Sequence, residues 1–146
     1  MKILSVLLFS LLMFSSSVWL TNFDDAQKIA KEKNQMILLN FSGSDWCIPC
    51  IRLKKEIFNS DTFNNFANTN LVLVNADFPR NKKNKLDKAQ VKLNEALADK
   101  YNPEGKFPYT LLLDANGKIL KTWDGLPKEN SVDFVETIRT VINGSK

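Results

Sequence analysis

The sequence predicts an α/β fold in which a central mixed sheet of four strands is flanked by helices on both faces. The first observation is a pair of nearly continuous apolar runs of strand length, residues 36–41 and 71–77, which are typical of buried central strands. The second is the helical pattern between them, because a strand, helix, strand unit places its two strands in parallel. The third is a hairpin, residues 107–113 and 118–123, which adds antiparallel strands.

Length and composition fit one globular domain. The chain has 146 residues, of which 44% are hydrophobic and 25% are charged, close to the averages for folded soluble proteins. The formal net charge of +4 is small, and acidic residues are interleaved with basic ones except in the segment 80–88. The composition therefore does not indicate nucleic-acid binding.

The first twenty residues carry the signals of export. Lys2 gives a positive start, residues 3–14 are apolar except for two serines, and three further serines offer a cleavage site. We therefore expect a cleaved signal peptide over 1–17 and a periplasmic location. The alternative is an uncleaved membrane anchor, because residues 3–20 form a segment of 18 residues, near the lower limit for spanning a bilayer.

Three helical segments are expected in the N-terminal half. Two aspartates precede a short helix, residues 26–33, which ends in lysines, so that its charges match the helix dipole. Apolar and charged residues interleave over 47–58, which indicates an imperfect amphipathic helix. Residues 60–66 form a short helical turn capped by Ser60 or Asp61.

The C-terminal half is predicted to hold two longer helices and the hairpin. Residues 87–101 form a helix, and the basic segment 82–85 before it is interpreted as a solvated loop. Residues 114–117 form the hairpin turn, and residues 131–142 form a closing helix with acids early and an arginine late. The predicted order is α, β, α, β, α, β, β, α, without an internal repeat.

The chemistry is predicted to lie in the two cysteines, Cys47 and Cys50. A bridge between them closes a very small loop and constrains the unfolded chain little, so a structural staple explains the pair poorly. They lie where a strand gives way to a helix, and unpaired N–H groups there stabilise a thiolate, the reactive form of cysteine. We expect Cys47 to be exposed and to attack a substrate disulfide, and Cys50 to be shielded and to resolve the mixed disulfide.

Neighbouring residues are expected to support this site. Pro49 suits the first turn of a helix, where its missing N–H costs nothing. Trp46 either packs beside the sulfur atoms or is an ordinary core tryptophan, and Asp45 precedes it. Four aromatic residues are candidates either for an apolar rim around Cys47 or for the core: Phe78, Phe107, Tyr109 and Trp123.

One stretch of sequence also resembles a known family. The run from Phe41 to Cys50, Phe-Ser-Gly-Ser-Asp-Trp-Cys-Ile-Pro-Cys, followed by Lys54, resembles the active-site region of the thioredoxin superfamily. Phe107-Pro108 before the hairpin looks like the cis-proline segment of that family, and the order of elements matches over nearly the whole mature chain. Exported bacterial thioredoxin-like proteins and the soluble reductase domain of thiol:disulfide interchange transporters are the members that it resembles most.

The resemblance implies a thioredoxin fold over 18–146 and a protein-disulfide oxidoreductase whose redox-active disulfide joins Cys47 and Cys50. It implies that Phe107 and Pro108 bind substrate, with the main chain of Phe107 pairing with the substrate backbone. The implied partners are exported proteins with disulfides and, as electron donor, a membrane thiol:disulfide interchange transporter. We expect a monomer without a cofactor or a nucleic-acid partner.

The sequence departs from the family at the central strand. Cytosolic members carry a buried aspartate there as proton acceptor for the resolving cysteine, whereas the corresponding residue here is Asn40, and an amide does not titrate. Asp45, Glu56 or water could take this role.

The absence of histidine from the chain narrows the chemistry further. Ser-His-Asp and Cys-His catalysis and a Cys₂His₂ zinc site are excluded within the chain. Ile48 and Pro49 cannot donate a hydrogen bond from a side chain to a thiolate, as a histidine between the cysteines does in strong oxidants. The hypothesis is therefore a reductase or isomerase rather than a primary oxidase.

The alternative function is a binding module. The two thiolates could bind Cu(I), for which soft sulfur ligands are suited, or the fold could bind a partner without catalysis. A third copper ligand would be needed, and none of Met1, Met13 and Met36 is well placed in the sequence. We expect no resident metal.

Overall fold

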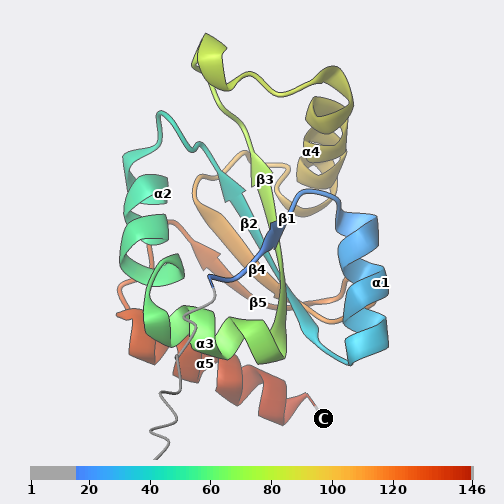
Figure 1. Ribbon diagram of the computed structural model, residues 1–146, viewed down its shortest axis with the longest axis vertical. Coiled ribbons are helices and arrows are strands. Elements are labelled where there is room, and N and C mark those ends of the chain that lie inside the picture. Colours follow the sequence, from blue (N-terminus) through green and yellow to red (C-terminus); the bar gives the residue numbers. More distant parts are fainter. Residues whose placement is uncertain (1–15, 146) are drawn as a thin grey trace, which may run out of the picture.

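The computed structural model describes residues 16–145 and contains one mixed sheet of five strands within that range (Figure 1). Its strand order is β1-β3-β2-β4-β5. β2 runs parallel to β3 and antiparallel to β4, which pairs antiparallel with β5. The strands are β1 (Trp19–Leu20), β2 (Met36–Ser42), β3 (Leu71–Asp77), β4 (Tyr109–Leu113) and β5 (Ile119–Asp124).

Helices cover both faces of the sheet, as predicted (Figure 1). α1 (Phe23–Lys33) and α4 (Lys88–Tyr101) pack on one face, and α2 (Ile48–Leu53), α3 (Asp61–Asn70) and α5 (Ser131–Gly144) pack on the other. A π-helix (Lys54–Phe58) extends α2, and a short 3₁₀ helix (Lys82–Asn84) precedes α4. The predicted fold class is therefore confirmed, with one more strand than expected.

The additional strand is β1, which pairs in parallel with β3 at the edge of the sheet. Two residues are too few to show the alternation that identifies a strand in a sequence. Trp19 is nevertheless anchored, because its ring packs on Phe58 at a centroid distance of 4.8 Å and on Phe63 at 6.3 Å. Ring packing therefore holds this edge strand in place.

Alternate residues of the central strands divide the core into two clusters. On β2, Leu38 faces the cluster under α2, α3 and α5, whereas Ile37 and Leu39 face the cluster under α1 and α4. This is the period of two that a strand imposes on its side chains. Because both faces are buried, the apolar run is continuous rather than alternating, which is the signal that predicted the strand.

The helix predicted over 47–58 is in fact two kinds of helix. After Leu53 the hydrogen bonds change to the i→i+5 pattern, and the N–H of Asn59 donates to the carbonyl of Lys54 at 2.8 Å. The π-turn brings Ile57 and Phe58 into the core together, with 2% and 5% of their surfaces exposed. The change from an α-helix to a π-helix therefore explains why the amphipathic pattern over 47–58 is imperfect.

The predicted signal peptide, residues 1–17, falls mostly outside the described residues. Among residues 16–145, no helix has both the length and the apolar character that crossing a bilayer requires. The fold instead brings the C-terminal end of β2 to the start of α2, beside the start of β4. That corner of the sheet carries the two cysteines.

Candidate active site

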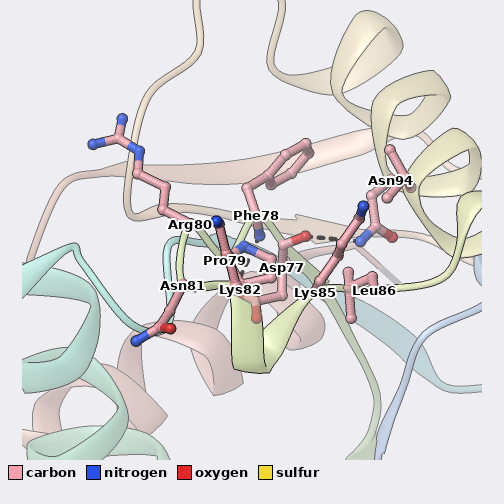
Figure 2. A pocket seen from close by; sticks show the side chains of 10 residues that line it. Asp77, Phe78, Pro79, Arg80, Asn81, Lys82, Lys85, Leu86 and Asn94 are labelled. Carbon is pink, nitrogen blue, oxygen red and sulfur yellow. Dashed lines mark hydrogen bonds between the residues drawn. The ribbon is translucent and has the colours of Figure 1, made fainter.

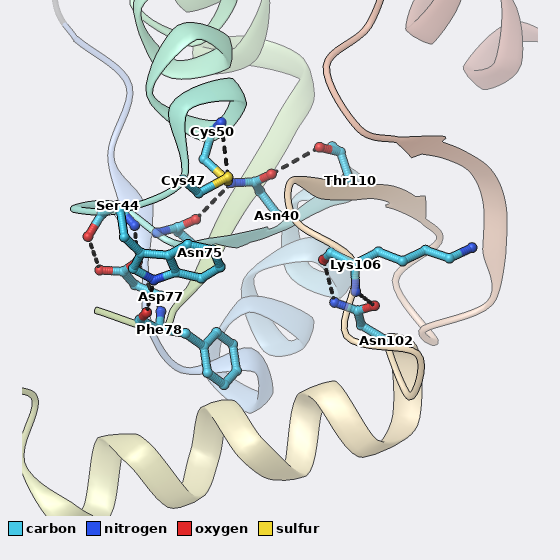
Figure 3. Close-up of a disulfide and its surroundings, with 11 residues drawn as sticks. Asn40, Ser44, Cys47, Cys50, Asn75, Asp77, Phe78, Asn102, Lys106 and Thr110 are labelled. Atoms are coloured by element: carbon cyan, nitrogen blue, oxygen red, sulfur yellow. Dashed lines mark hydrogen bonds between the residues drawn. A yellow bond between two sulfur atoms is a disulfide. The ribbon is translucent and has the colours of Figure 1, made fainter. Parts of the chain in front are cut away.

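Cys47 and Cys50 form a disulfide at the junction of β2 and α2 (Figure 3). Cys47 is the N-cap residue of α2, and its sulfur accepts a hydrogen bond from the backbone N–H of Cys50 at 3.3 Å. Pro49 lies in the first turn, where its missing N–H leaves no helix hydrogen bond unmade. The Cα atoms of the two cysteines are 5.2 Å apart.

The expected difference in exposure between the cysteines is not found. Cys47 has 5% of its surface exposed and Cys50 has 4%, so the expectation of an exposed Cys47 is wrong for this disulfide form. As N-cap, Cys47 turns its side chain back over the first turn of the helix, and the bonded sulfur atoms cover each other. Ile48, between them, is 70% exposed and marks the open side of the site.

Three residues contact the side chain of Trp46, which precedes the disulfide in the chain. Its indole N–H donates to the carbonyl oxygen of Phe78 at 2.7 Å. The ring of Phe107 packs edge-on against it at 5.5 Å, and the Arg80 guanidinium carbon lies 3.6 Å from the ring centroid. Of the two sequence interpretations, the structure favours packing at the site, because Trp46 is half-buried and belongs to neither core cluster.

The segment before β4 faces the same corner. The Phe107-Pro108 peptide bond is cis, as the resemblance implied. Asn102 is 3% exposed and braces this segment, since its side chain accepts from the N–H of Lys106 at 2.9 Å and donates to the carbonyl of Lys106 at 2.8 Å (Figure 3). The sequence analysis did not identify Asn102. Its hydrogen bonds to the main chain of Lys106 form only when the loop between them folds, so no local pattern marks it.

The four aromatic candidates separate into different environments. Phe78 and Phe107 contact each other at 5.4 Å, and Phe107 also contacts Trp46. Trp123 instead lies in the core, with its ring 4.8 Å from that of Phe134, so it is not part of a rim. Tyr109 is half-buried beneath the ammonium of Lys106, 5.6 Å from its ring.

A model of the thioredoxin-like domain family matches residues 23–139. The chain belongs to this family. The resemblance seen in the sequence is thereby confirmed, and a solved structure described as the DsbH oxidoreductase superimposes with a TM-score of 0.79 at 29% identity, covering 88% of this chain and 86% of that one.

One relative and one structural neighbour of this thioredoxin-like chain are informative. The disulfide bond reductase DsbH of Chlamydia pneumoniae is 36% identical over 99 residues, which cover 68% of this chain and 58% of the relative. The aligned stretch thus spans somewhat more than half of that protein. The oxidised C-terminal domain of Neisseria meningitidis DsbD superimposes with a TM-score of 0.55 at 18% identity, covering 81% of this chain and 90% of that domain, which shows a shared fold.

A hollow of about 350 Å³ lies next to Cys50 in this thioredoxin-like site. Asn40, 5% exposed, lines it and belongs to a hydrogen-bonded chain across three strands (Figure 3). Its amide donates to the side-chain oxygen of Asn75 at 2.9 Å, and its carbonyl accepts from the hydroxyl of Thr110 at 3.0 Å. Both polar groups of Asn40 are therefore satisfied without a charge.

This polar chain was only partly visible in the sequence. Asn75 and Thr110 interrupt otherwise apolar strand runs, and that interruption is the signal that could have identified them. Among the described residues that line the hollow, Lys54 is the only titratable side chain besides Cys50 itself. A hollow with several polar groups on its wall can hold water, which could carry the proton of Cys50.

The two acids considered as substitutes for the missing aspartate lie elsewhere. Glu56 is half exposed and pairs with Arg52 at 2.9 Å on the outer surface of the helix. Asp45 is hydrogen-bonded to the segment 80–84. Its carboxylate accepts from the N–H of Arg80, the N–H of Asn81 and the amide of Asn84, each at 2.9 Å. Neither acid lines the hollow beside Cys50.

Asp45 instead ties the active-site turn to the segment 80–84. The N–H of Arg80, followed by the amide of Asn84, holds the pKa of the Asp45 carboxyl below its ordinary value. The basic segment interpreted as a merely solvated loop is therefore tethered, although its lysine side chains are exposed. The two carboxylate oxygens of Asp45 accept two backbone N–H groups and one side-chain amide, whereas an asparagine would offer only one acceptor oxygen.

Replacing Asp45 with alanine is expected to free this segment while the fold persists. Hydrogen exchange at the amides of Arg80 and Asn81 should accelerate at pH 7, because both lose their acceptor. In the wild type the tether should hold above the ordinary aspartate pKa of about 3.9 and weaken as pH falls through the lower folded value. Asp99→Ala, at an exposed aspartate of α4, is the control and should leave these amides unchanged; equal protection in both variants would contradict the tether.

The described residues offer little for a metal. Within 16–145 no group of three His, Cys, Asp or Glu side chains is arranged to hold an ion. Met36 begins β2, at the far end of the strand from the cysteines. Met1 and Met13 lie outside the described residues.

Proposed function

We propose that this protein is a thiol:disulfide oxidoreductase that acts on disulfides of exported proteins, as a reductase or isomerase. The observation that carries the proposal is the Cys47–Cys50 disulfide at the start of α2, with Phe107 packed against the adjoining Trp46. Membership of the thioredoxin-like family and the relative described as a disulfide bond reductase support it.

The reaction needs two sulfur exchanges. In the reduced protein the Cys47 thiolate attacks one sulfur of the substrate disulfide, and the other leaves as a thiolate, which gives a mixed disulfide. The Cys50 thiolate then attacks the sulfur of Cys47, the second substrate thiolate leaves, and the Cys47–Cys50 disulfide forms. Two electrons have passed to the substrate, so an external dithiol must reduce the protein again.

The surrounding residues have distinct roles in this proposal. The N–H of Cys50 stabilises negative charge on the Cys47 sulfur, as its hydrogen bond in the disulfide form indicates. Pro49 fixes the first turn of the helix, and Trp46, held by the carbonyl of Phe78, positions the turn that precedes Cys47. Phe107 pairs with the substrate backbone beside Pro108, and its ring contacts Trp46, the residue before Cys47.

The direction of electron flow follows from the small number of hydrogen-bond donors around the Cys47 sulfur. Strong oxidants are strong because their reduced thiolate is greatly stabilised. Here the Cys50 N–H is the donor to the Cys47 sulfur within the described residues, and Ile48 and Pro49 add no side-chain donor. The Cys47 thiolate of the reduced protein is therefore stabilised less than in a strong oxidant, and the pair favours giving electrons to a substrate.

Location and partners complete the proposal. Residues 1–17 act as a signal peptide that delivers a monomeric domain to the periplasm, where disulfides form and need correction. A membrane thiol:disulfide interchange transporter supplies electrons, and nucleic acid is not a partner.

The reduction potential of the pair tests the proposal. We expect equilibration with glutathione to give a potential well below about −120 mV, the value of a strong oxidant, and nearer to that of a thioredoxin, about −270 mV. A potential near the oxidant value would contradict a reductase or isomerase. Tight stoichiometric Cu(I) binding without any disulfide exchange would indicate a metal-binding module instead.

A further inference from the structure

A second hollow, of about 240 Å³, lies in the segment that joins β3 to α4 (Figure 2). Its wall is mainly apolar, and cationic side chains surround it. The apolar part consists of Phe78, Pro79, Leu86 and Val91, and the cations are Arg80, Lys82 and Lys85. One acid, Asp77, and two amides, Asn81 and Asn94, complete the lining. The volume is below the range of about 300 to 1,000 Å³ that is usual for small-molecule sites, so it suits a single side chain better than a cofactor.

Two residues that line this hollow, Phe78 and Arg80, also contact residues around the redox site. The carbonyl of Phe78 accepts the indole N–H of Trp46, and Arg80 covers the Trp46 ring at 3.6 Å. The Phe78 ring also packs against Phe107 at 5.4 Å, which precedes the cis-proline. A protein segment that enters the hollow would therefore lie close to Trp46, the residue before Cys47.

The nearby acids offset only part of the positive charge. Their hydrogen bonds come from neutral donors and leave their charge in place, but five cations, Arg80, Lys82, Lys83, Lys85 and Lys88, stand against three acids, Asp45, Asp77 and Asp87, a net charge of +2. Asp45 is held by three donors of the loop, and the Asp77 carboxylate accepts from the N–H and hydroxyl of Ser44 and from the N–H of Phe78. Asp87 caps α4 by accepting from the N–H of Gln90.

The cations themselves have no partner of opposite charge. Within residues 16–145, none of Arg80, Lys82, Lys83 and Lys85 forms an ion pair. The surface beside the hollow therefore keeps a positive field.

We propose that this hollow is a docking site for a substrate segment that carries carboxylates next to an apolar side chain. The apolar side chain fills the hollow, and the flanking carboxylates pair with Lys82, Lys83 and Lys85. Complementary charge speeds encounter and fixes orientation, so that the substrate disulfide arrives at Cys47. This inference rests on the proposed function and names the class of substrate that it prefers.

A protein segment fits better than an anionic membrane surface. Residues of the hollow contact Trp46, next to Cys47, and the reaction requires a partner disulfide within bonding distance of Cys47. Its apolar wall offers burial for one side chain, which a lipid headgroup does not use.

Two disulfide-closed peptides test the inference. In the first, glutamates flank a phenylalanine next to the disulfide, and in the second, lysines replace the glutamates. At low salt, kcat/KM should be about tenfold higher for the acidic peptide, and the ratio should fall towards one at high salt, because electrostatic steering is screened. The triple variant K82Q/K83Q/K85Q should lose most of this ratio.

The control is K31Q/K33Q/K118Q, which removes the same charge from exposed lysines at the opposite end of the sheet and should keep the wild-type ratio. A ratio near one in the wild type, or an unchanged ratio in the first variant, would overturn the inference while leaving the proposed function intact. No turnover of either peptide or of glutathione disulfide would overturn the proposed function and the inference with it. Binding to vesicles of anionic lipid that depends on the three lysines, with no peptide preference, would assign the surface to a membrane and also overturn the inference.

Discussion

Replacing Cys47 with serine is expected to reduce insulin-disulfide reduction to the uncatalysed rate, while replacing Cys50 with serine is expected to accumulate mixed disulfides. Serine is nearly the size of cysteine but is not a thiolate at neutral pH, so the first variant lacks the attacking sulfur. The second variant keeps Cys47 but cannot carry out the exchange that releases the substrate. Gel mobility under non-reducing conditions and mass spectrometry distinguish the two results.

Each of the two variants serves as the control for the other. Both remove the same disulfide and leave one cysteine, so a difference between them cannot come from the loss of the bridge. Full activity in Cys47→Ser, or trapping through Cys50 with Cys47 absent, would show that the nucleophile is assigned wrongly.

Replacing Gly43 with alanine is expected to displace Trp46 from the active site. Gly43 is buried after the end of β2, and a Cβ there would overlap the indole ring, with its nitrogen only 2.7 Å away. The ring would have to leave the carbonyl of Phe78 and the faces that it shares with Arg80 and Phe107. We expect kcat/KM to fall by about tenfold to a hundredfold, since small misplacements near reacting atoms have effects of that size.

The same substitution should lower the free energy of unfolding by about 1–3 kcal/mol, the usual cost of overpacking a closely packed site. Denaturant unfolding measures this, and the indole N–H resonance of Trp46 reports the lost hydrogen bond. Gly144→Ala, where a Cβ meets nothing within 4 Å, is the control and should change none of these properties. An unshifted resonance with wild-type activity in Gly43→Ala would contradict the close approach.

The strands could be predicted from the sequence more reliably than the details of the helices. β2 and β3 are buried on both faces, so their apolar residues are consecutive and easily recognised. The change from α2 to a π-helix was not predicted, because apolar spacing of this kind also fits an imperfect α-helix. β1 was not predicted because a strand of two residues is too short to show the alternation of side chains that identifies a strand.

The candidate site was predicted in its chemistry but not in its surroundings. The cysteines, Pro49 and the segment containing Pro108 are recognisable from local spacing and from resemblance. Asn75, Thr110 and Asn102 were not identified, since each acts through a hydrogen bond whose partner is set by the fold.

By itself the sequence determined that a pair of cysteines opens a helix after a buried strand, because burial and helix capping depend on residues close together in the chain. Only the tertiary structure decided what surrounds that pair. Asp45 meets Arg80 across 35 positions, and Asn40 meets Thr110 across 70. Such contacts depend on strand register and loop path, so Asp45, one of three alternatives for proton transfer in the sequence, ties a basic loop to the active-site turn in the folded chain.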